Sequence, residues 1–295
     1  MYRVQVLMST YNGERYLKEQ IDSIIKQKDV EASLLIRDDG SKDNTAKILE
    51  EYGKFSNISV IYGANLGATR SFFELIRLSG NFDFYSFADQ DDVWDEDKLI
   101  CAVNMLKEHL TIPCVYSSNT RLVDEKLKPL KSVLYEPKIS LGSVIVKNIS
   151  AGCTMVMNNV LMKQLKAYIP SNVPYHDWWV NVVTLSLGGK IVFDEKPHIS
   201  YRQHGNNVVG AQEDILKKWQ GRLNKYLNSS YRRDDFVKEV IKGYGKVISE
   251  DNLHILELMA NYRSKPVALL KSKYFHTAGL LENIAFGICV LTKRA

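Results

Sequence analysis

The chain has 295 residues, of which 45% are hydrophobic and 25% charged. This is the composition of an ordinary globular protein, so wholesale disorder is excluded. A chain of this length buries roughly three-quarters of its unfolded surface and needs neither disulfides nor a structural metal. None of the cysteines forms a CxxC pair, so we predict neither a zinc site nor a disulfide framework, and a reducing cytoplasm fits best. The four cysteines are Cys101, Cys114, Cys153 and Cys289.

The start of the chain and its charge distribution bear on where it works. Val4 to Met8 is a short apolar run followed at once by polar residues, which is not typical of a signal peptide. No apolar stretch reaches the ~18 residues that a membrane-spanning helix needs. Residues 211–295 hold 15 Lys and Arg against 9 Asp and Glu, whereas the first 210 hold 24 against 25. The basic excess therefore lies in the last 85 residues, which indicates two regions with different partners.

Strand-like and helix-like segments alternate through the first part of the chain. Short apolar runs predict strands at residues 4–8, 34–36, 58–62 and 82–87. Apolar residues at helical spacing lie between them, and this order favours an α/β fold with a parallel, doubly wound sheet. Ligands bind such sheets beyond the carboxyl ends of the strands, and polar clusters follow three of these four strands.

The pattern changes after residue 112. Residues 113–157 predict short strands and loops, and a helix is expected near residues 159–168. Two closing strands are expected at residues 191–193 and 199–202. Beyond about Ala211 the spacing of apolar residues is helical. The helices expected there cover residues 215–227, 236–248 and 255–262.

An Asp-rich turn follows the fourth predicted strand. Asp89, Asp91 and Asp92 would repel one another unless a cation neutralises them. Hard oxygen ligands at a strand end suit Mg²⁺ or Mn²⁺ that also contacts a phosphate. The alternative is a solvated turn in which Asp95 and Glu96 favour the positive end of the next helix. That alternative leaves Asp89 and Asp91 unexplained, and both interpretations stay open.

Two further clusters could contact a nucleotide. In the pair Asp38 and Asp39, one carboxylate can cap the following turn, and one can accept a hydrogen bond from a ring nitrogen of a bound base. Gly67 stands at the start of a predicted helix, where a phosphate can approach and Arg70 supplies positive charge. Asn-x-Gly is also ordinary turn chemistry.

Two clusters in the second half could also carry chemistry. Asp177 can cap a helix whose tryptophans are core residues, or act as a general base beside an aromatic surface on which an acceptor sugar stacks. His204 lies in a polar loop beside Arg202, where it is either structural or a contact for a metal or phosphate.

The order of these motifs resembles that of the family 2 inverting glycosyltransferases, which have the GT-A fold. The resemblance covers residues 3–207 and is carried by STYNGE, DDGSKDNT, NLGATR, ADQDDVW and HDWW. Five segments look more narrowly like bacterial rhamnosyltransferases that build cell-surface polysaccharides. These are ADQDDVW, SNTRLVDE, SAGCTMVMN, HDWW and YRQHGNNVVG.

The resemblance implies roles for the nucleotide and metal residues. The nucleotide would be bordered by Ser9, Thr10 and Tyr11, with Asp39 accepting the N3–H of uracil or thymine and Arg70 near the base or diphosphate. The Asp-x-Asp pair for Mn²⁺ or Mg²⁺ would be Asp89 and Asp91, with Asp91 the direct ligand, Asp89 also near the nucleotide and Asp92 helping. His204 would be a further metal or diphosphate contact.

The resemblance also implies the reaction. Asp177 would be the catalytic base, and the acceptor would meet His176, Trp178 and Trp179. The implied activity moves L-rhamnose from dTDP-L-rhamnose to a lipid-linked saccharide in cell-wall, capsular or O-antigen synthesis. No processive QxxRW motif is found, which favours transfer of one sugar over polymerisation. The alternatives are a UDP-hexose donor, or a catalytically silent part of a membrane-bound assembly complex. A nucleotidyltransferase is disfavoured because the loop after the first strand has one glycine and an acid.

These roles predict the domain organisation. A catalytic domain is expected over residues 1–210, with a nucleotide-sugar half at 1–112 and an acceptor half at 113–210, and a basic helical region over 211–295. Within the latter, Gly279 to Leu291 is apolar, too short to span a bilayer, and flanked by cations. It predicts contact with the inner face of the cell membrane, or alternatively a packed helical subdomain. Nucleic acid is not expected, since no binding motif or dense basic cluster occurs.

Overall fold

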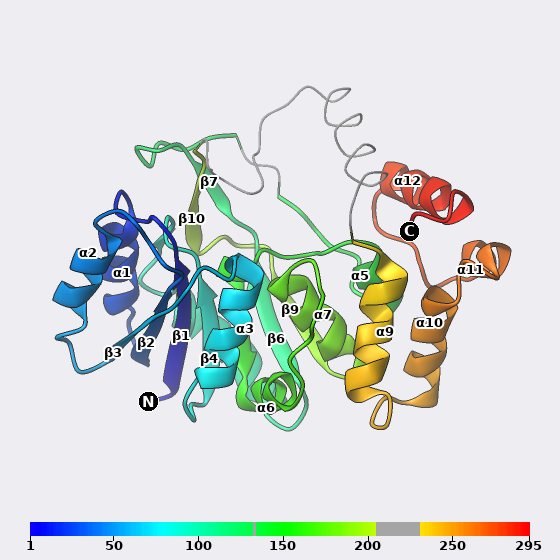
Figure 1. Ribbon diagram of the computed structural model, residues 1–295, viewed down its shortest axis with the longest axis horizontal. Coiled ribbons are helices and arrows are strands. Elements are labelled where there is room, and N and C mark those ends of the chain that lie inside the picture. Colours follow the sequence, from blue (N-terminus) through cyan, green and yellow to red (C-terminus); the bar gives the residue numbers. More distant parts are fainter. Residues whose placement is uncertain (132–133, 205–230) are drawn as a thin grey trace. The chain divides into compact units, whose positions relative to one another are not determined.

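The computed structural model describes residues 1–131, 134–204 and 231–295 (Figure 1). These residues belong to two compact units that interleave along the sequence. Unit 1 consists of residues 1–135, 150–169 and 190–207, and unit 2 of residues 136–149, 170–189 and 208–295. The predicted helix at 215–227 and the predicted domain boundary at residue 210 lie outside the described residues, so both stay predictions.

Unit 1 is built on a seven-stranded sheet with the strand order β3-β2-β1-β4-β8-β6-β9. Its neighbouring strands are parallel except that β8 runs antiparallel to both β4 and β6, so the predicted mostly parallel sheet is confirmed. Continuous apolar runs form these strands because both faces of the sheet are covered. The strands are β1 (Arg3–Thr10), β2 (Glu31–Asp38), β3 (Ile58–Tyr62), β4 (Phe84–Ala88), β6 (Cys114–Ser118), β8 (Val156–Asn158) and β9 (Lys190–Asp194).

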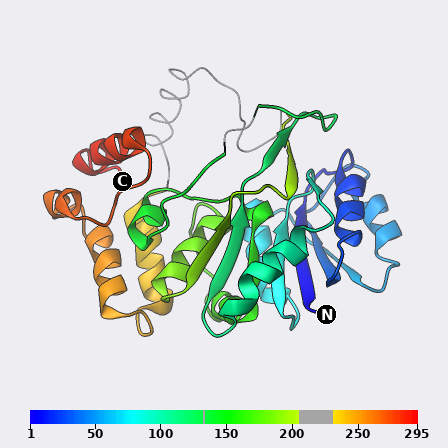
Figure 2. The ribbon, with the colours of Figure 1, turned by 180° about the vertical axis from the view of Figure 1, so that it is seen from behind.

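Helices cover both faces of this sheet. Val4 and Met8 of β1 pack in one core cluster with α1 and α4, while Phe72 of α3 meets Phe87 of β4 with ring centroids 5.2 Å apart. Accordingly α3 lies in front of the sheet in Figure 1, and α4 lies in front of it when seen from behind in Figure 2. The helices of unit 1 are α1 (Leu17–Ile25), α2 (Thr45–Tyr52), α3 (Ala68–Leu78), α4 (Lys98–Leu106) and α6 (Asn159–Ala167), with 3-10 turns at Lys107–His109 and Gly152–Thr154.

A second, three-stranded sheet holds the loops at one end of unit 1. In it β10 (Ile199–Arg202) pairs antiparallel with β5 (Val93–Trp94) and parallel with β7 (Arg121–Val123). The two predicted closing strands therefore belong to different sheets, because β9 joins the large sheet and β10 the small one. This arrangement carries the segment after β10 to the Asp-rich turn that precedes β5.

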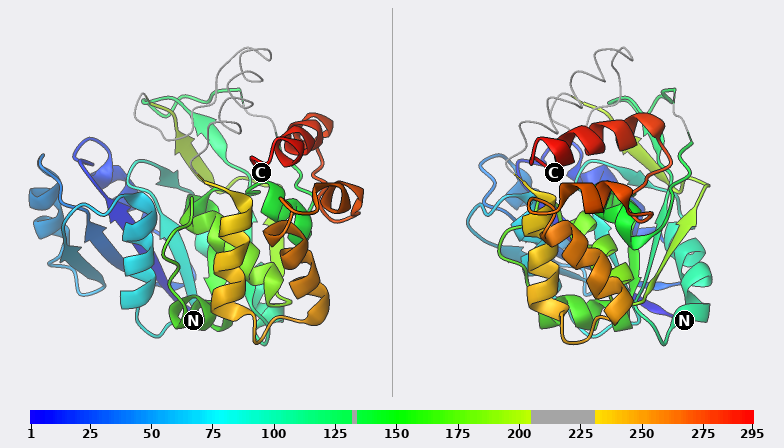
Figure 3. Two further views of the ribbon diagram at one scale, coloured as in Figure 1. Left: turned by 45° about the vertical axis from the view of Figure 1, so that its right-hand side comes forward. Right: turned by 90° about the vertical axis from the view of Figure 1, so that its right-hand side faces the viewer.

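Unit 2 is helical. Two of its helices lie side by side and are joined by a short turn, as both views of Figure 3 show for α9 and α10. The core includes Trp179, whose ring centroid lies 6.0 Å from that of Phe236 and 6.1 Å from that of Tyr244. The helices are α5 (Leu141–Val146), α7 (His176–Ser186), α9 (Arg233–Tyr244), α10 (Glu250–Ala260), α11 (Pro266–Lys271) and α12 (Leu280–Leu291).

The helical C-terminal region is confirmed by α9 to α12. The helix α5 differs from the sequence prediction, which gives strands and loops over residues 113–157. Its N-cap is Ser140, whose side-chain oxygen accepts a hydrogen bond from the Ser143 amide while the Ser143 hydroxyl accepts one from the Ser140 amide, the geometry of a capping box. Among the described residues, none of the helices combines the length and the apolar character that crossing a membrane requires.

Candidate functional site

The polar segments after β1, β2 and β4 meet, because these three strands are neighbours in the sheet. The Gln90 side-chain oxygen accepts hydrogen bonds from the Thr10 hydroxyl at 2.6 Å and the Tyr11 amide at 2.8 Å. The Asn12 amide donates to the Ser41 hydroxyl at 2.9 Å. At Gly13 a Cβ atom would come within 2.5 Å of the Gln90 side-chain oxygen, so a larger residue there would have to displace the Gln90 side chain. The three segments therefore form one connected surface.

A cavity of about 540 Å³ opens at this surface, a size typical of small-molecule sites. Its wall offers an aromatic ring, because Tyr11 is 42% exposed, and an acidic group at Asp91. Two other lining residues, Arg15 and Glu125, form an ion pair at 2.6 Å. The lining residues are Tyr11, Asn12, Gly13, Arg15, Tyr16, Gln90, Asp91, Glu125 and His204.

Asp91 and His204 come together at the cavity wall. Nε2 of His204 lies 2.7 Å from Oδ2 of Asp91, although the two residues are 113 positions apart in the chain. The His204 ring stacks on Tyr16, with centroids 5.2 Å apart and an interplanar angle of 26°. The structure thus places next to each other two of the residues that the sequence assigns to a metal or phosphate.

The other two aspartates of the turn lie deeper. The carboxylates of Asp89 and Asp92 and the thiol of Cys153 come within 4.8 Å of one another. Asp92 is fully buried, and burial together with the charges of Asp91 and Asp89 raises the pKa of its carboxyl well above the usual range. Its Oδ1 accepts a hydrogen bond from the Arg202 amide at 3.1 Å, whereas its Oδ2 has no partner among the described residues. This unmet acceptor in an acidic turn fits a divalent cation nearby.

A buried lysine lies under the same turn. Nζ of Lys98 is 3.4 Å from the centroid of the Trp94 ring and donates to the Ser86 hydroxyl at 3.2 Å. Burial lowers the pKa of Lys98 to about 7, while Cys153 and Asp92 partly oppose this shift. The lysine is therefore a partial counter-charge for the acidic turn.

Arg202 is the residue that sequence reasoning missed. Its guanidinium is 2% exposed and donates to the backbone oxygens of Asp91 at 2.8 Å and Glu125 at 2.5 Å. It also pairs with Glu19, and its Cζ lies 4.4 Å from the centroid of the Tyr16 ring. One side chain thus joins α1, the acidic turn and the loop after β7. In the sequence, only the position of Arg202 two residues before His204 indicates a role at this site.

The DDGS segment divides its two aspartates between two tasks. Oδ1 of Asp38 accepts hydrogen bonds from the amide and hydroxyl of Ser41, so the predicted turn-capping role falls to Asp38. Asp39 is buried, pairs with Arg37, and accepts from the amides of Leu66 at 2.8 Å and Gly67 at 2.9 Å. Asp39 therefore holds the loop that precedes α3.

The remaining nucleotide residues predicted from the sequence lie around the start of α3. Gly67 has a φ of +79°, which favours glycine, and α3 begins directly after it. Arg70 is exposed in the first turn of α3. The Ser9 hydroxyl donates to the Ser71 hydroxyl at 2.7 Å, which joins the end of β1 to this helix.

The HDWW residues belong to unit 2, at the start of α7. Asp177 is the second residue of the helix and accepts from the Trp178 amide at 2.7 Å, while the cap position is Tyr175. Nε1 of Trp178 donates to the Val144 oxygen at 2.6 Å. Trp179 has no exposed surface, which corrects its predicted contact with an acceptor. Burial lowers the pKa of His176 to about 3, so its ring is neutral.

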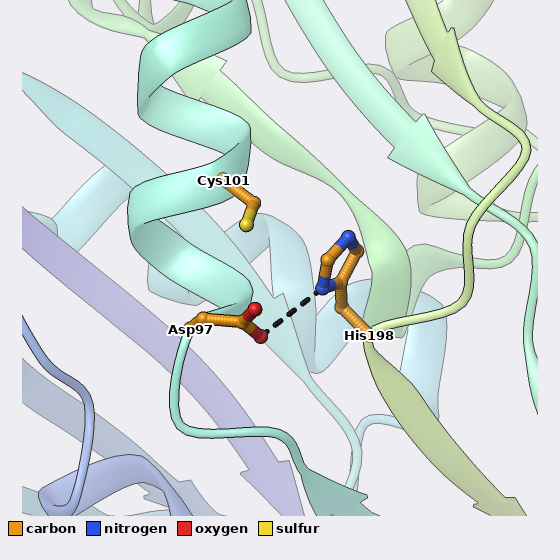
Figure 4. Close-up of side chains that lie close together, drawn as sticks. All are labelled: Asp97, Cys101 and His198. Atoms are coloured by element: carbon orange, nitrogen blue, oxygen red, sulfur yellow. Dashed lines mark hydrogen bonds and ion pairs between the residues drawn. The ribbon is translucent and has the colours of Figure 1, made fainter.

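A second cluster of possible metal ligands lies elsewhere in unit 1 (Figure 4). Nδ1 of His198 is 3.2 Å from Oδ1 of Asp97, and its Nε2 is 3.3 Å from Oδ2 of Asp194. Burial and then the charge of Asp97 raise the pKa of the neighbouring Cys101 thiol. Both ring nitrogens thus have carboxylate partners, and the cluster ties the start of α4 to β9 and β10.

Comparison with known proteins places this chain in a family. Residues 5–165 match the model of glycosyl transferase family 2. A dTDP-rhamnosyl transferase, RfbG of Shigella flexneri, is 32% identical over 77% of this chain and 81% of its own length. A glucosyltransferase of Escherichia coli, WfgD, named for UDP-Glc and a diphosphoundecaprenol-linked acceptor, is 28% identical over 60% of this chain and 68% of its own.

The fold has solved counterparts. TarS of S. aureus in complex with UDP-GlcNAc is 18% identical, with a TM-score of 0.59 over 91% of this chain and 83% of that one. The mannosyltransferase PcManGT of Pyrobaculum calidifontis, in complex with GDP-Man and Mn²⁺, is 16% identical, with a TM-score of 0.54 over 98% and 75%. These likenesses support the GT-A fold. The chain therefore belongs to glycosyl transferase family 2 and is a glycosyltransferase.

Proposed function

We propose that this enzyme transfers one L-rhamnose from dTDP-L-rhamnose to a lipid-linked saccharide during polysaccharide synthesis at the inner face of the cell membrane. The observation that carries the proposal is the convergence of Tyr11, Asp91 and His204 on one cavity in a family 2 enzyme. The donor is inferred from RfbG, a dTDP-rhamnosyl transferase, and the lipid-linked acceptor from WfgD. The same site with a UDP-hexose donor is the second candidate, because the WfgD name specifies UDP-Glc.

The nucleotide is proposed to lie against Tyr11, whose exposed ring offers a stacking face. Ser9 and Thr10 would border it, and Asp39 would accept the N3–H of thymine or uracil with a lone pair beyond those that bind the loop amides. Arg70, exposed on the first turn of α3, would approach the base or diphosphate. A cytosine base lacks the N3–H, so CMP-sugars are disfavoured.

The acidic turn is proposed to hold Mn²⁺ or Mg²⁺ through Asp91, with Asp89 and His204 as further contacts. The donors fit, because carboxylate oxygens and an imidazole nitrogen stand together and the deeper Asp92 carboxylate keeps an unmet buried oxygen. When bound, such a cation would offset the negative charge that grows on the departing diphosphate. Arg202 would keep the turn in place through the backbone oxygen of Asp91.

Transfer is proposed to invert the anomeric carbon in one displacement. Asp177, in the first turn of α7, would take the proton of the acceptor hydroxyl as that oxygen forms its bond to the sugar. The bond from the anomeric carbon to the diphosphate oxygen breaks on the opposite face, and the nucleoside diphosphate leaves with the electron pair. No covalent enzyme intermediate is involved. His176 and Trp178 flank this carboxylate in the sequence and would contact the acceptor.

The proposal can be tested with a panel of nucleotides. We expect dTDP-L-rhamnose with Mn²⁺ to raise the thermal stability of the protein more than UDP-glucose does, because a ligand that binds only the folded state stabilises it. CDP serves as the control that lacks the N3–H. A larger shift with UDP-sugars would select the second donor, and no shift with any nucleotide would support a catalytically silent component. NMR of the product then determines its anomeric configuration, which we expect to be inverted relative to the donor.

A further inference from the structure

The last helix of unit 2 has an exposed apolar face. Five large apolar residues of α12 are between 39% and 72% exposed. At about 100° per residue they fall within roughly a quarter to a third of the helix circumference. These residues, the outer face of α12, are Leu280, Leu281, Ile284, Ile288 and Leu291. The opposite side contains Ala285, Phe286, Cys289 and Val290, all buried.

The outer face has no polar residue to explain its exposure. The only charged residue within α12 is Glu282, and its carboxylate pairs with Lys147 at 2.6 Å while being 18% exposed. A helix that is apolar on both sides is normally covered on both sides. A contiguous exposed apolar patch indicates contact with a partner or with lipid.

The charges around the helix specify the kind of partner. From Arg263 to Ala295 the chain carries six Lys and Arg against one carboxylate, Glu282. Lys271 and Lys273 precede α12 and Lys293 and Arg294 follow it, and all four are exposed. An apolar face with cations at both ends complements a surface that is anionic outside and apolar beneath.

We propose that the outer face of α12 lies in the headgroup layer of an anionic membrane, parallel to its plane. This inference rests on the proposed function in one respect, since a lipid-linked acceptor would bring the enzyme to that surface. The 12 residues of α12 are too few to span a bilayer, for which about 20 are needed. A second copy of the chain fits less well, because a two-fold contact through this face would bring the same cations together.

Co-sedimentation of the full chain with vesicles tests the proposal. The wild type is expected to bind phosphatidylglycerol-containing vesicles at low salt and to bind pure phosphatidylcholine vesicles far less. Leu280→Asp should weaken binding about tenfold or more, because one buried leucine side chain is lost from the interface. Val247→Asp is the matched control, since Val247 is 67% exposed on the turn after α9 and Leu280 is 72% exposed. The control should bind like the wild type.

A second variant tests the charges. Lys271→Gln combined with Lys273→Gln should weaken binding to anionic vesicles about tenfold and leave the weak binding to neutral vesicles unchanged. Equal binding to both vesicle types would overturn the proposal, and so would a dimer that Leu280→Asp converts to a monomer. Sugar transfer to a soluble acceptor is measured alongside and should be unchanged in Leu280→Asp. Wild-type protein that binds anionic vesicles but transfers no sugar to the soluble acceptor would instead count against the proposed function and leave the membrane inference standing.

Discussion

At the scale of single residues, the proposed metal site depends most on Asp91. Its carboxylate shares a hydrogen bond with His204, so a cation would take the place of the proton between them. Asp91→Asn should lower metal-dependent transfer about a hundredfold or more and leave thermal stability within the range of surface changes. Asp29→Asn, an exposed aspartate in a turn with φ of +58°, is the control. Full turnover of the Asp91 variant at ordinary Mn²⁺ would remove the metal from this site.

A second prediction concerns Asp177 as the proposed catalytic base. Asp177→Asn keeps the shape and the acceptor oxygen for the Trp178 amide but cannot take a proton. Turnover of bound donor should fall by about 10² to 10⁴, whereas the affinity for donor should stay constant. Single-turnover rates together with a binding isotherm separate the two quantities. If affinity collapsed while turnover of bound donor survived, Asp177 would belong to the donor site.

A substitution at Asp39 distinguishes a role in recognising the nucleotide base from a role in holding the loop before α3. In Asp39→Asn one oxygen becomes an NH₂ group that faces an amide or Arg37, so we expect a loss of about 1–3 kcal/mol of stability as well as weaker binding of dTDP. Chemical denaturation and dTDP titration measure both. Asp22→Asn, whose partner is the Tyr52 hydroxyl, is a control outside the site. Weaker binding with unchanged stability would assign Asp39 to base recognition alone.

At the scale of elements, Arg202 joins segments that the sheet alone does not connect. Lysine cannot reproduce three separate contacts with one ammonium group, so Arg202→Lys should lower the free energy of unfolding by about 2–4 kcal/mol. Arg77→Lys is the matched change, because Arg77 pairs with Glu74 on the exposed face of α3, and it should alter stability by less than about 0.5 kcal/mol. An Arg202→Lys protein as stable as the wild type would show that the guanidinium is dispensable.

The elements also differ in how well the sequence predicts them. The helix α3 follows from local periodicity, because its buried side chains recur at helical spacing, and the strand at Ile58–Tyr62 follows from its short run of β-branched and aromatic residues. The pairing of β10 with β5 and β7 does not follow from local periodicity, because the sequence pattern of a short strand does not specify which sheet the strand joins. Its place depends on contacts with segments roughly eighty to a hundred residues away.

At the scale of the whole molecule, buried titratable groups couple stability to pH. The pKa of His176 is lowered to about 3 by burial, and its Nε2 is buried although the residue is partly exposed. The unfolded chain binds a proton below pH 6.5 and the folded chain does not, so this group destabilises the fold as pH falls from 6.5 towards 3. Each pH unit in that window should cost up to about 1.4 kcal/mol.

Removing the imidazole isolates this effect. In His176→Gln the free energy of unfolding should fall less steeply between pH 6.5 and 4 than in the wild type, as followed by denaturation with tryptophan fluorescence. The exposed His276→Gln should keep the wild-type slope. Identical slopes for all three proteins would mean that His176 is accessible to protons in the folded state.

The sequence by itself determined the mostly parallel sheet, the helical C-terminal region and the family, because strand and helix periods and short motifs are local signals. It also placed Ser9, Asp39 and Asp89 at strand ends, where a parallel sheet gathers them. Tertiary structure decided the burial of Asp92 and Trp179, the contacts of Arg202 and the exposure of the outer face of α12. Each of these depends on which distant segment packs against the residue, and no local pattern specifies that partner.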